Sequence, residues 1–292
     1  MNIIEKDNQI ILEGISEDFE PKHVFECGQC FRWLREDDGS YTGVVQGKVI
    51  NVKKENDLII FDNTNKEDFE NIWFDYFDLG RNYGEIKKQL KVMDEYLEKA
   101  TEFGQGIRIL QQDGWEMLIS FIISANNRIP MIQRAINNLS ERYGKFIDEY
   151  RGKKYYAFPT PEELSKVSVE DIRACQTGFR DKYIKSVVDY VNENNEDVLS
   201  YRKLDTSECI KELVKFNGVG PKVADCIALF GMQKYDTFPV DVWVKRVMEE
   251  FYVEDNLSLP KIRKFALDKF GDLAGFAQQY LFYYARELGI GR

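Results

Sequence analysis

Short runs of hydrophobic residues, bounded by polar turn residues, dominate the first hundred positions of this chain. Such runs, rich in β-branched and aromatic residues, are typical of strands, and aspartate, glycine and asparagine favour the turns between them. Four runs have this pattern, at residues 9–12, 41–45, 48–52 and 58–61. The N-terminal part is therefore predicted to form a small antiparallel β-sheet.

Helix start signals replace these runs after about residue 100. Three pairs of a cap residue and an acidic residue three positions later mark such starts: Asp113 and Glu116, Thr160 and Glu163, and Ser168 and Asp171. The pattern predicts an α+β fold, with an antiparallel sheet domain at residues 1–105 and a mainly helical domain at residues 106–292. Since neither repeats nor a flexible linker separate them, we expect the two domains to pack together.

The composition is typical of a globular protein from a reducing compartment. The 292 residues, 43% hydrophobic and 14% aromatic, can form a sizeable core. The N-terminus lacks the features of a signal peptide, and the most apolar run, 117–125, is too short to cross a bilayer. The five cysteines lack the density of a disulfide scaffold. We therefore expect a soluble cytoplasmic protein without membrane contact, associated with the nucleoid if the source is prokaryotic.

A glycine turn, a lysine and a helix start lie together at residues 218–226. Gly218 and Gly220 allow positive φ and outward N–H groups, which suit a hairpin that grips a phosphate. Pro221 fits the first position of a helix that ends at Gly231. Lys222 then lies at the positive end of the helix dipole, where the dipole and desolvation disfavour its ammonium form. We expect a neutral amine that acts as a nucleophile.

Asp241 lies 19 positions after Lys222, directly before an apolar helical pattern at residues 242–248. It is predicted to cap that helix and so to stay ionised. The spacing leaves room for one short helix and one turn between the lysine and the carboxylate. Each feature also has an ordinary explanation: a common turn, a solvated lysine and a structural N-cap.

Residues 218–226 and 239–241 together resemble the helix-hairpin-helix and Pro-Val-Asp signature of base-excision DNA glycosylases, and most closely the 8-oxoguanine DNA glycosylase family. The resemblance extends over nearly the whole chain. It implies a helix-hairpin-helix at about residues 212–231, catalytic Lys222 and Asp241, and an N-terminal domain that contributes to lesion recognition. It further implies a bifunctional DNA glycosylase and AP lyase that excises 8-oxoguanine from duplex DNA through a lysine Schiff base. We expect a monomer without a nucleotide or other cofactor.

Two pairs of residues spaced i, i+4 form the predicted base pocket, since such residues share one helix face. The first pair is Lys222 and Cys226, and the second is Gln278 and Phe282. The resemblance implies that the flipped base stacks between Cys226 and Phe282, that Gln278 reads its Watson–Crick edge, and that Pro239 also contributes to the pocket. By periodicity alone, Phe282 is more typical of a core residue than of a stacking platform.

Residues 27–33 resemble the family segment in which a glycine carbonyl, here that of Gly28, accepts a hydrogen bond from N7–H of 8-oxoguanine. Normal guanine has no proton at N7, so this one acceptor can reject it. The alternative for Cys27 and Cys30 is a zinc half-site or a redox pair. A zinc site needs further ligands, and the chain has no second Cys-x-x-Cys and one histidine, His23. We therefore expect no catalytic metal, and the lack of cysteines after 226 excludes a C-terminal iron–sulfur loop.

Further positions match family residues that contact DNA. The resemblance implies that Asn126 fills the hole left by the extruded base, that residues 178–180 carry a wedge, and that the hairpin binds the backbone. The predicted DNA-contacting residues are Asn126, Met131, Phe179, Arg180, Gly218, Val219, Gly220 and Trp243. Without the resemblance, an Asn-Asn pair at 126–127 is an ordinary helix terminator.

Three of these residues differ from the better-known eukaryotic members of the family. Phe179 replaces a tyrosine, Trp243 replaces a histidine, and Met131 replaces an arginine that reads the cytosine opposite the lesion. Without that guanidinium, a relaxed preference for the opposite base is expected. By analogy with the family, the main-chain carbonyls of Val214, Phe216 and Val219 are predicted to hold a structural cation.

The net charge of −10 is unusual for a protein that binds a polyanion. Residues 1–100 carry −9 of it and residues 101–292 only −1. Contacts through backbone amides and helix N-termini need few lysines, so we expect a shallow salt dependence of DNA binding. Two alternatives stay open at this point: a glycosylase of the same superfamily for another damaged base, and a noncatalytic DNA-binding module in which Lys222 only contacts phosphate.

Overall fold

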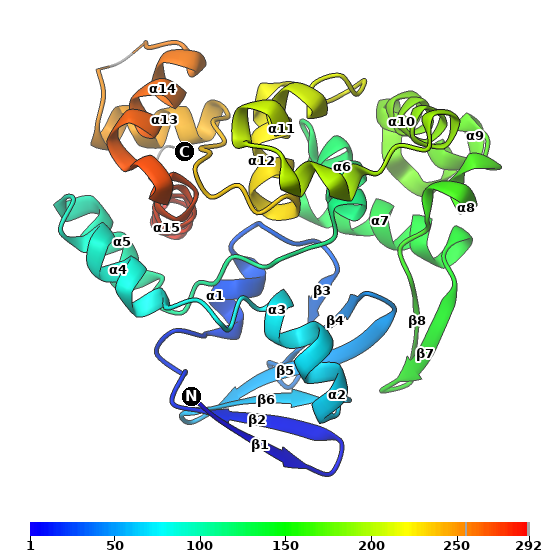
Figure 1. The fold of residues 1–292 in the computed structure, drawn as a ribbon, viewed down its shortest axis with the longest axis horizontal. Coiled ribbons are helices and arrows are strands. Elements are labelled where there is room, and N and C mark those ends of the chain that lie inside the picture. Colours follow the sequence, from blue (N-terminus) through cyan, green and yellow to red (C-terminus); the bar gives the residue numbers. More distant parts are fainter. Residues whose placement is uncertain (255, 291–292) are drawn as a thin grey trace.

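The computed structural model describes residues 1–254 and 256–290. A six-stranded antiparallel sheet forms the lower part of the molecule in Figure 1, and helices form the upper part. In the sheet the strands lie in the order β1-β2-β6-β5-β4-β3. Their bounds are β1 Asn2–Lys6, β2 Gln9–Glu13, β3 Trp33–Arg35, β4 Tyr41–Val45, β5 Lys48–Glu55 and β6 Leu58–Asp62. The four predicted strands are confirmed, and β1 and β3 extend the sheet at its two edges.

The helices are confirmed as the dominant elements after residue 100, and several short ones precede it. None within the described residues is long and apolar enough to span a membrane. The helices are α1 Pro21–Glu26, α2 Lys66–Asp68, η1 Phe69–Trp73, α3 Phe74–Tyr76, α4 Tyr83–Lys91, α5 Glu95–Phe103, α6 Gly114–Ser124, α7 Ile129–Tyr143, α8 Pro161–Ser165, α9 Val169–Ile172, η2 Arg173–Thr177, η3 Gly178–Arg180, α10 Asp181–Asn194, η4 Val198–Lys203, α11 Thr206–Leu213, α12 Pro221–Gly231, α13 Val242–Phe251, α14 Leu259–Phe270, η5 Gly271–Leu273 and α15 Ala274–Leu288.

Two hydrophobic cores organise the fold. One lies between the sheet and the helices α1 to α3, and it is rich in stacked and edge-to-face aromatic rings. The other lies among the helices from α4 onward and includes Cys27 and Phe31 of the loop after α1. Helices α4 and α5 pack with α15, although they precede the predicted division at residue 105. The loop with Gly28 therefore spans both cores, which brings a sheet-side segment to the helical part.

The predicted helix starts are confirmed. For two of them, at Asp113 and Thr160, the acidic residue three positions later is also expected to bond back to the cap in a capping box, and this expectation is wrong for Asp113. Thr160 and Glu163 form both hydrogen bonds of a box, whereas Asp113 only accepts the backbone N–H of Glu116 at 2.8 Å. The Glu116 carboxylate instead faces Arg32, with 3.7 Å between Oε2 and Nη1. A buried guanidinium needs a counter-charge, and this requirement outweighs a local cap hydrogen bond.

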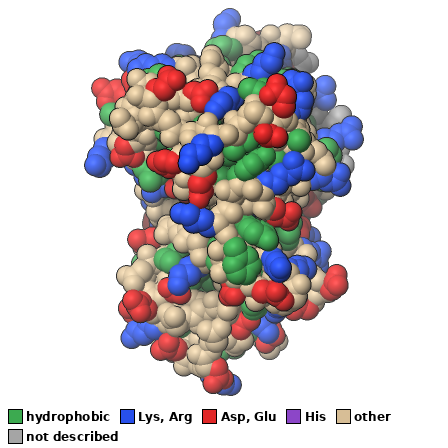
Figure 2. Space-filling view, turned by 90° about the vertical axis from the view of Figure 1, so that its right-hand side faces the viewer, with side chains coloured by type: hydrophobic (Ala, Val, Ile, Leu, Met, Phe, Trp, Pro, Cys, Tyr) green, Lys and Arg blue, Asp and Glu red, His purple; other side chains and the backbone are tan. Residues whose placement is uncertain are grey.

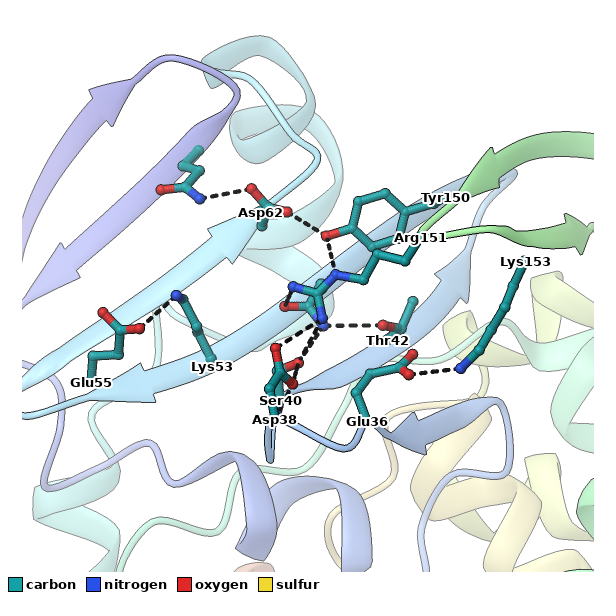
Figure 3. Close-up of polar contacts among 12 residues, drawn as sticks. Glu36, Asp38, Ser40, Thr42, Lys53, Glu55, Asp62, Tyr150, Arg151 and Lys153 are labelled. Carbon is teal, nitrogen blue, oxygen red and sulfur yellow. Dashed lines mark hydrogen bonds and ion pairs between the residues drawn. The ribbon is translucent and has the colours of Figure 1, made fainter.

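A β-hairpin of the helical part, absent from the sequence prediction, crosses onto the sheet (Figure 3). It consists of β7 Phe146–Tyr150 and β8 Lys153–Tyr156. Tyr150 donates its hydroxyl to Asp62, Arg151 Nη1 lies 3.1 Å from Asp38 Oδ2, and Lys153 Nζ lies 2.7 Å from Glu36 Oε2. These ion pairs and hydrogen bonds join the two parts on the side away from α15.

Candidate active site

The turn before α12 places Lys222 on the first turn of that helix. Gly218 has φ +89°, and a Cβ there would lie 2.9 Å from the Tyr183 ring, so glycine is needed at this position. Gly220 has φ −85° as the N-cap, so the predicted positive φ is wrong for it. Pro221 is the first residue of α12, as predicted.

Asp241 is the N-cap of α13, as the sequence predicts. Its Oδ1 accepts the backbone N–H groups of Trp243 and Val244 at 2.9 and 2.8 Å. These two hydrogen bonds fix the carboxylate at the end of the segment that follows α12. Pro239 is buried within the same segment.

Lys222 is half-buried and lies between Cys226 and Asp241, with Nζ 6.0 Å from the centre of the Phe121 ring. The Cys226 sulfur and the Asp241 carboxylate raise the pKa of Lys222 above its ordinary value, although burial acts in the opposite direction. Burial raises the pKa of Cys226 to about 11, so this sulfur is an uncharged thiol at neutral pH. The Asp241 carboxylate also favours the ammonium form of Lys222, with a smaller effect than that of the sulfur.

The prediction of a neutral lysine is therefore wrong for the protein without DNA. Burial does lower the pKa of Lys222, but the Cys226 sulfur, which has the largest effect, and the Asp241 carboxylate together outweigh it. The predicted proximity of Lys222 and Asp241 is confirmed, because the carboxylate acts directly on the amine. The amine has to lose a proton before it can attack an electrophile.

Gly28 lies directly against Phe282 of α15. A Cβ at Gly28, where φ is +92°, would lie 3.3 Å from Cε1 of that ring. The Trp243 ring meets Phe282 edge to face, with 4.6 Å between ring centres. The half-buried Phe282 thus joins the loop after α1, the start of α13 and α15 in one place.

Two adjacent amides of α15 also face this place. Gln279 Nε2 donates to the carbonyl of Cys27 at 3.3 Å and so holds the residue before Gly28. Gln278 is only 6% exposed, yet its Oε1 has no hydrogen-bond partner among the described residues. Buried polar atoms without a partner are costly in a folded protein, so an unsatisfied amide oxygen marks a position that a ligand can complete.

Four of the predicted DNA-contacting residues lie around the loop between α6 and α7. Asn126 is exposed with φ 51°, Met131 is 38% exposed, and Phe179 is 59% exposed. Arg180 is buried instead, and it donates from Nε and Nη2 to the carbonyls of Ala125 and Asn126 at 2.9 Å each. Its guanidinium also lies 4.3 Å from the centre of the Phe179 ring. Arg180 therefore holds the Asn126 loop and the Phe179 ring in a common position.

The face of the molecule shown in Figure 2 carries no large field of one sign. Acidic and basic side chains are interspersed on it, and hydrophobic side chains are exposed between them. This distribution fits the even charge balance of residues 101–292.

The cysteine pair near Gly28 consists of buried thiols. Burial raises the pKa of Cys27 to about 11 and that of Cys30 well above its ordinary value. Metal binding requires thiolates, and within the described part of the chain no group of three or more His, Cys, Asp and Glu side chains could hold a metal ion.

Comparisons with known proteins agree with this geometry. The description "8-oxoguanine DNA glycosylase, N-terminal domain" matches residues 11–118, and "HhH-GPD superfamily base excision DNA repair protein" matches residues 119–272. An N-glycosylase/DNA lyase of Saccharomyces cerevisiae is 31% identical, over 91% of this chain and 83% of that protein. The crystal structure of Clostridium acetobutylicum 8-oxoguanine glycosylase/lyase, in complex with double-stranded DNA containing cytosine opposite 8-oxoG, is 52% identical with a TM-score of 0.95, over 99% of both chains. The chain belongs to the 8-oxoguanine DNA glycosylase family.

The fold alone is shared more widely than this family. The 3-methyladenine DNA glycosylase of Archaeoglobus fulgidus has a TM-score of 0.75 over 99% of both chains, at 21% identity. Substrate choice within the fold therefore depends on pocket residues.

Three residues near the site were not predicted from the sequence. They are Gln279 on α15, and Thr237 and Arg263, which donate hydrogen bonds to Asp225 on the lysine helix. Their roles depend on contacts with other elements, which leave no local pattern in the sequence.

Proposed function

We propose that the protein is a bifunctional DNA glycosylase and AP lyase that excises 8-oxoguanine from duplex DNA in base excision repair. The observation that carries this proposal is the position of the Lys222 amine. This amine is half-buried at the end of the hairpin and interacts electrostatically with Asp241, the N-cap of α13. A noncatalytic hairpin needs no carboxylate beside its lysine, since the carboxylate weakens attraction to phosphate.

The substrate nucleotide leaves the base stack before reaction, because its sugar is otherwise out of reach of the amine. Flipping costs a few kcal/mol, which stacking and hydrogen bonds in the pocket offset. Phe179 is exposed and supported by Arg180, so it suits the role of a wedge, and Asn126 suits the position left by the base. The hairpin amides at Gly218, Val219 and Gly220 suit backbone phosphates. Trp243, at the start of α13, packs against Phe282, and its backbone N–H donates to Asp241. It is therefore suited to contact the DNA strand that carries the lesion.

Lys222 acts as the nucleophile once it has lost its proton. Its Nζ forms a bond to C1′ while the bond from C1′ to N9 breaks, and the base departs with the bonding electrons and takes up a proton. The Asp241 carboxylate stabilises the positive charge that develops on the sugar and orients the amine. The Nζ lone pair then opens the sugar ring: the C1′–O4′ bond breaks, O4′ takes up a proton, and a protonated Schiff base forms at C1′. Loss of a C2′ proton from this Schiff base expels the 3′ phosphate and cleaves the strand.

Discrimination against guanine rests on the segment beside Phe282. The carbonyl of Gly28 would accept N7–H of 8-oxoguanine and would repel the lone pair on N7 of guanine. Gln278 Oε1 would gain the partner that it lacks without DNA, and Cys226, Phe282 and Pro239 would enclose the base. Binding of the lesion would thus satisfy the Gln278 Oε1 atom, which has no partner among the described residues, and would use the Phe282 ring that already packs against Gly28.

Borohydride trapping tests the proposal. Wild-type protein should form a covalent adduct with a duplex containing 8-oxoguanine and none with the same duplex containing guanine. Adducts on both duplexes would contradict the lesion specificity, and an adduct on neither would contradict the Schiff base.

We further propose a relaxed preference for the base opposite the lesion. Met131 at the start of α7 offers no charged donor to cytosine. Excision rates on duplexes with each of the four bases opposite 8-oxoguanine should differ by less than about tenfold, and Met131→Arg should raise the preference for cytosine. Strong cytosine selectivity in the wild type would contradict this proposal.

The remaining expectations are also proposals. Neutral main-chain carbonyls at Val214, Phe216 and Val219 suit a weakly held monovalent cation, although the Phe216 carbonyl already accepts the Val219 N–H at 3.1 Å. We propose a cytoplasmic monomer that needs no cofactor. Its DNA binding should weaken only slightly with salt, because backbone amides make most of the contacts.

A further inference from the structure

We infer that Asp225 is a positioning residue, which holds the lysine and the carboxylate of the active site at a fixed separation. It lies on α12 between Lys222 and Cys226, and its side chain accepts hydrogen bonds from Thr237 and Arg263, which belong to two other segments. The inference rests on the proposed function, because it concerns the reaction of Lys222.

Asp225 is 1% exposed and fully engaged. Its Oδ1 accepts Thr237 Oγ1 at 2.8 Å and Arg263 Nη2 at 2.8 Å, and its Oδ2 accepts Arg263 Nε at 2.7 Å. The bidentate geometry fixes the plane of the carboxylate as well as its distance. Thr237 is itself fully buried, so the contact cannot be replaced by water.

The three partners come from the three elements that surround the reacting groups. Asp225 is three positions after Lys222 and therefore shares the first turns of α12 with it. Thr237 is four positions before Asp241, in the segment that leads to the α13 N-cap. Arg263 belongs to α14, which packs on α13. Movement of α12 relative to the segment with Asp241 would break these hydrogen bonds, so the buried cluster sets the separation between amine and carboxylate.

The hydrogen bonds around the site assign this positioning role to Asp225. Asp241 is fixed from its own helix by two backbone N–H groups, and Lys222 is fixed by α12. Among the hydrogen bonds between described residues, the bond from Thr237 to Asp225 links the lysine helix directly to the segment before Asp241. A Lys222 that is displaced by even 1 Å would lose most of the advantage of correct orientation.

The test compares Asp225→Asn with wild type on a duplex that contains a preformed abasic site. We expect the rate of borohydride trapping to fall at least tenfold, while the affinity for a duplex with an uncleavable abasic analogue stays within about twofold. Asp78→Asn is the matched control, because Asp78 is also buried and accepts from Arg81 Nε at 2.6 Å and Tyr83 at 3.0 Å. The thermal stability of the Asp78→Asn variant should fall, whereas its trapping rate should stay near that of wild type.

A second pair of variants decides the matter if Asp225→Asn does not fold. Thr237→Val removes the hydroxyl at constant shape and should slow trapping, whereas Thr237→Ser keeps the hydroxyl and should restore the rate. Wild-type rates in Asp225→Asn or in Thr237→Val would overturn the inference. Absence of any adduct with wild-type protein would instead overturn the proposed function.

Discussion

Gln278 and Gln279 are neighbouring buried amides for which the structure predicts opposite effects of replacement by methionine. Gln278 is 6% exposed and its Oε1 lacks a partner, whereas Gln279 is 2% exposed and donates to Cys27. Methionine has a similar length and no strongly polar group. An unsatisfied buried polar atom costs about 1–3 kcal/mol, and a satisfied buried hydrogen bond contributes about 1 kcal/mol.

Without DNA, Gln278→Met should therefore raise the free energy of unfolding by about 1 kcal/mol or more, which corresponds to about 2–4 °C in Tm for a protein of this size. Gln279→Met should lower the Tm by a similar amount, since it removes a hydrogen bond that the folded state already makes. Thermal denaturation of the two variants beside wild type measures both effects.

The activity of Gln278→Met should fall on one substrate only. Loss of its contacts with the base edge, about 1–3 kcal/mol, reduces single-turnover excision of 8-oxoguanine by about 10–100-fold. Cleavage at a preformed abasic site should stay within about twofold of wild type, because that substrate presents no base. Equal losses on both substrates, or a Tm that falls as it does for Gln279→Met, would refute the assignment of Gln278 to base recognition.

Three further predictions follow from groups around the site. Burial raises the pKa of Glu116 from 4.5 to about 7, against the opposing effect of Arg32. The folded state then holds the proton more tightly than the unfolded state, so the free energy of unfolding should fall by about 3 kcal/mol between pH values of about 4.5 and 8. Denaturant titrations of Glu116→Gln should show a flatter profile over this pH range; an unchanged slope would contradict the burial argument. The neighbours of Lys222 raise its pKa, so only a small fraction of the amine is neutral and reactive at neutral pH. We therefore expect kcat/KM for abasic-site cleavage to rise about tenfold per pH unit between about pH 6 and 9. A plateau below about pH 8 would contradict a protonated Lys222. Gly28→Ala forces a Cβ toward Phe282 at a backbone φ of +92°. It should reduce 8-oxoguanine excision at least tenfold more than abasic-site cleavage, as measured by time courses on the two duplexes. Equal losses on both would place Gly28 outside the base pocket.

Sequence patterns predicted the elements that local chemistry determines. The four inner strands of the sheet, the start of α12 at Pro221 and the cap of α13 by Asp241 are confirmed, because each depends on residues within a few positions. The β7 to β8 hairpin escaped prediction because its strands are polar and partly exposed on both faces, so they lack an alternating pattern. Strand β3 is only three residues long and gives too little pattern to recognise.

Properties set by distant residues could not be predicted from the sequence. Glu116 turns to Arg32 rather than to its own helix cap, and Asp241, together with the Cys226 sulfur, raises the pKa of Lys222 despite its burial. Asp225 looked like one more residue of the motif, whereas its partners lie 12 and 38 positions away. In each case an interaction between separate elements outweighs a local preference, and only the packed structure shows which interaction is made.

The central claim is that the Lys222 amine forms the bond to the sugar, with Asp241 beside it. Peptide mapping by mass spectrometry of the borohydride-reduced adduct with an 8-oxoguanine duplex tests this most directly. We expect the reduced sugar to be attached to Lys222, and we expect Lys222→Gln to yield no adduct. Attachment to another lysine, or an undiminished adduct with Lys222→Gln, would contradict it.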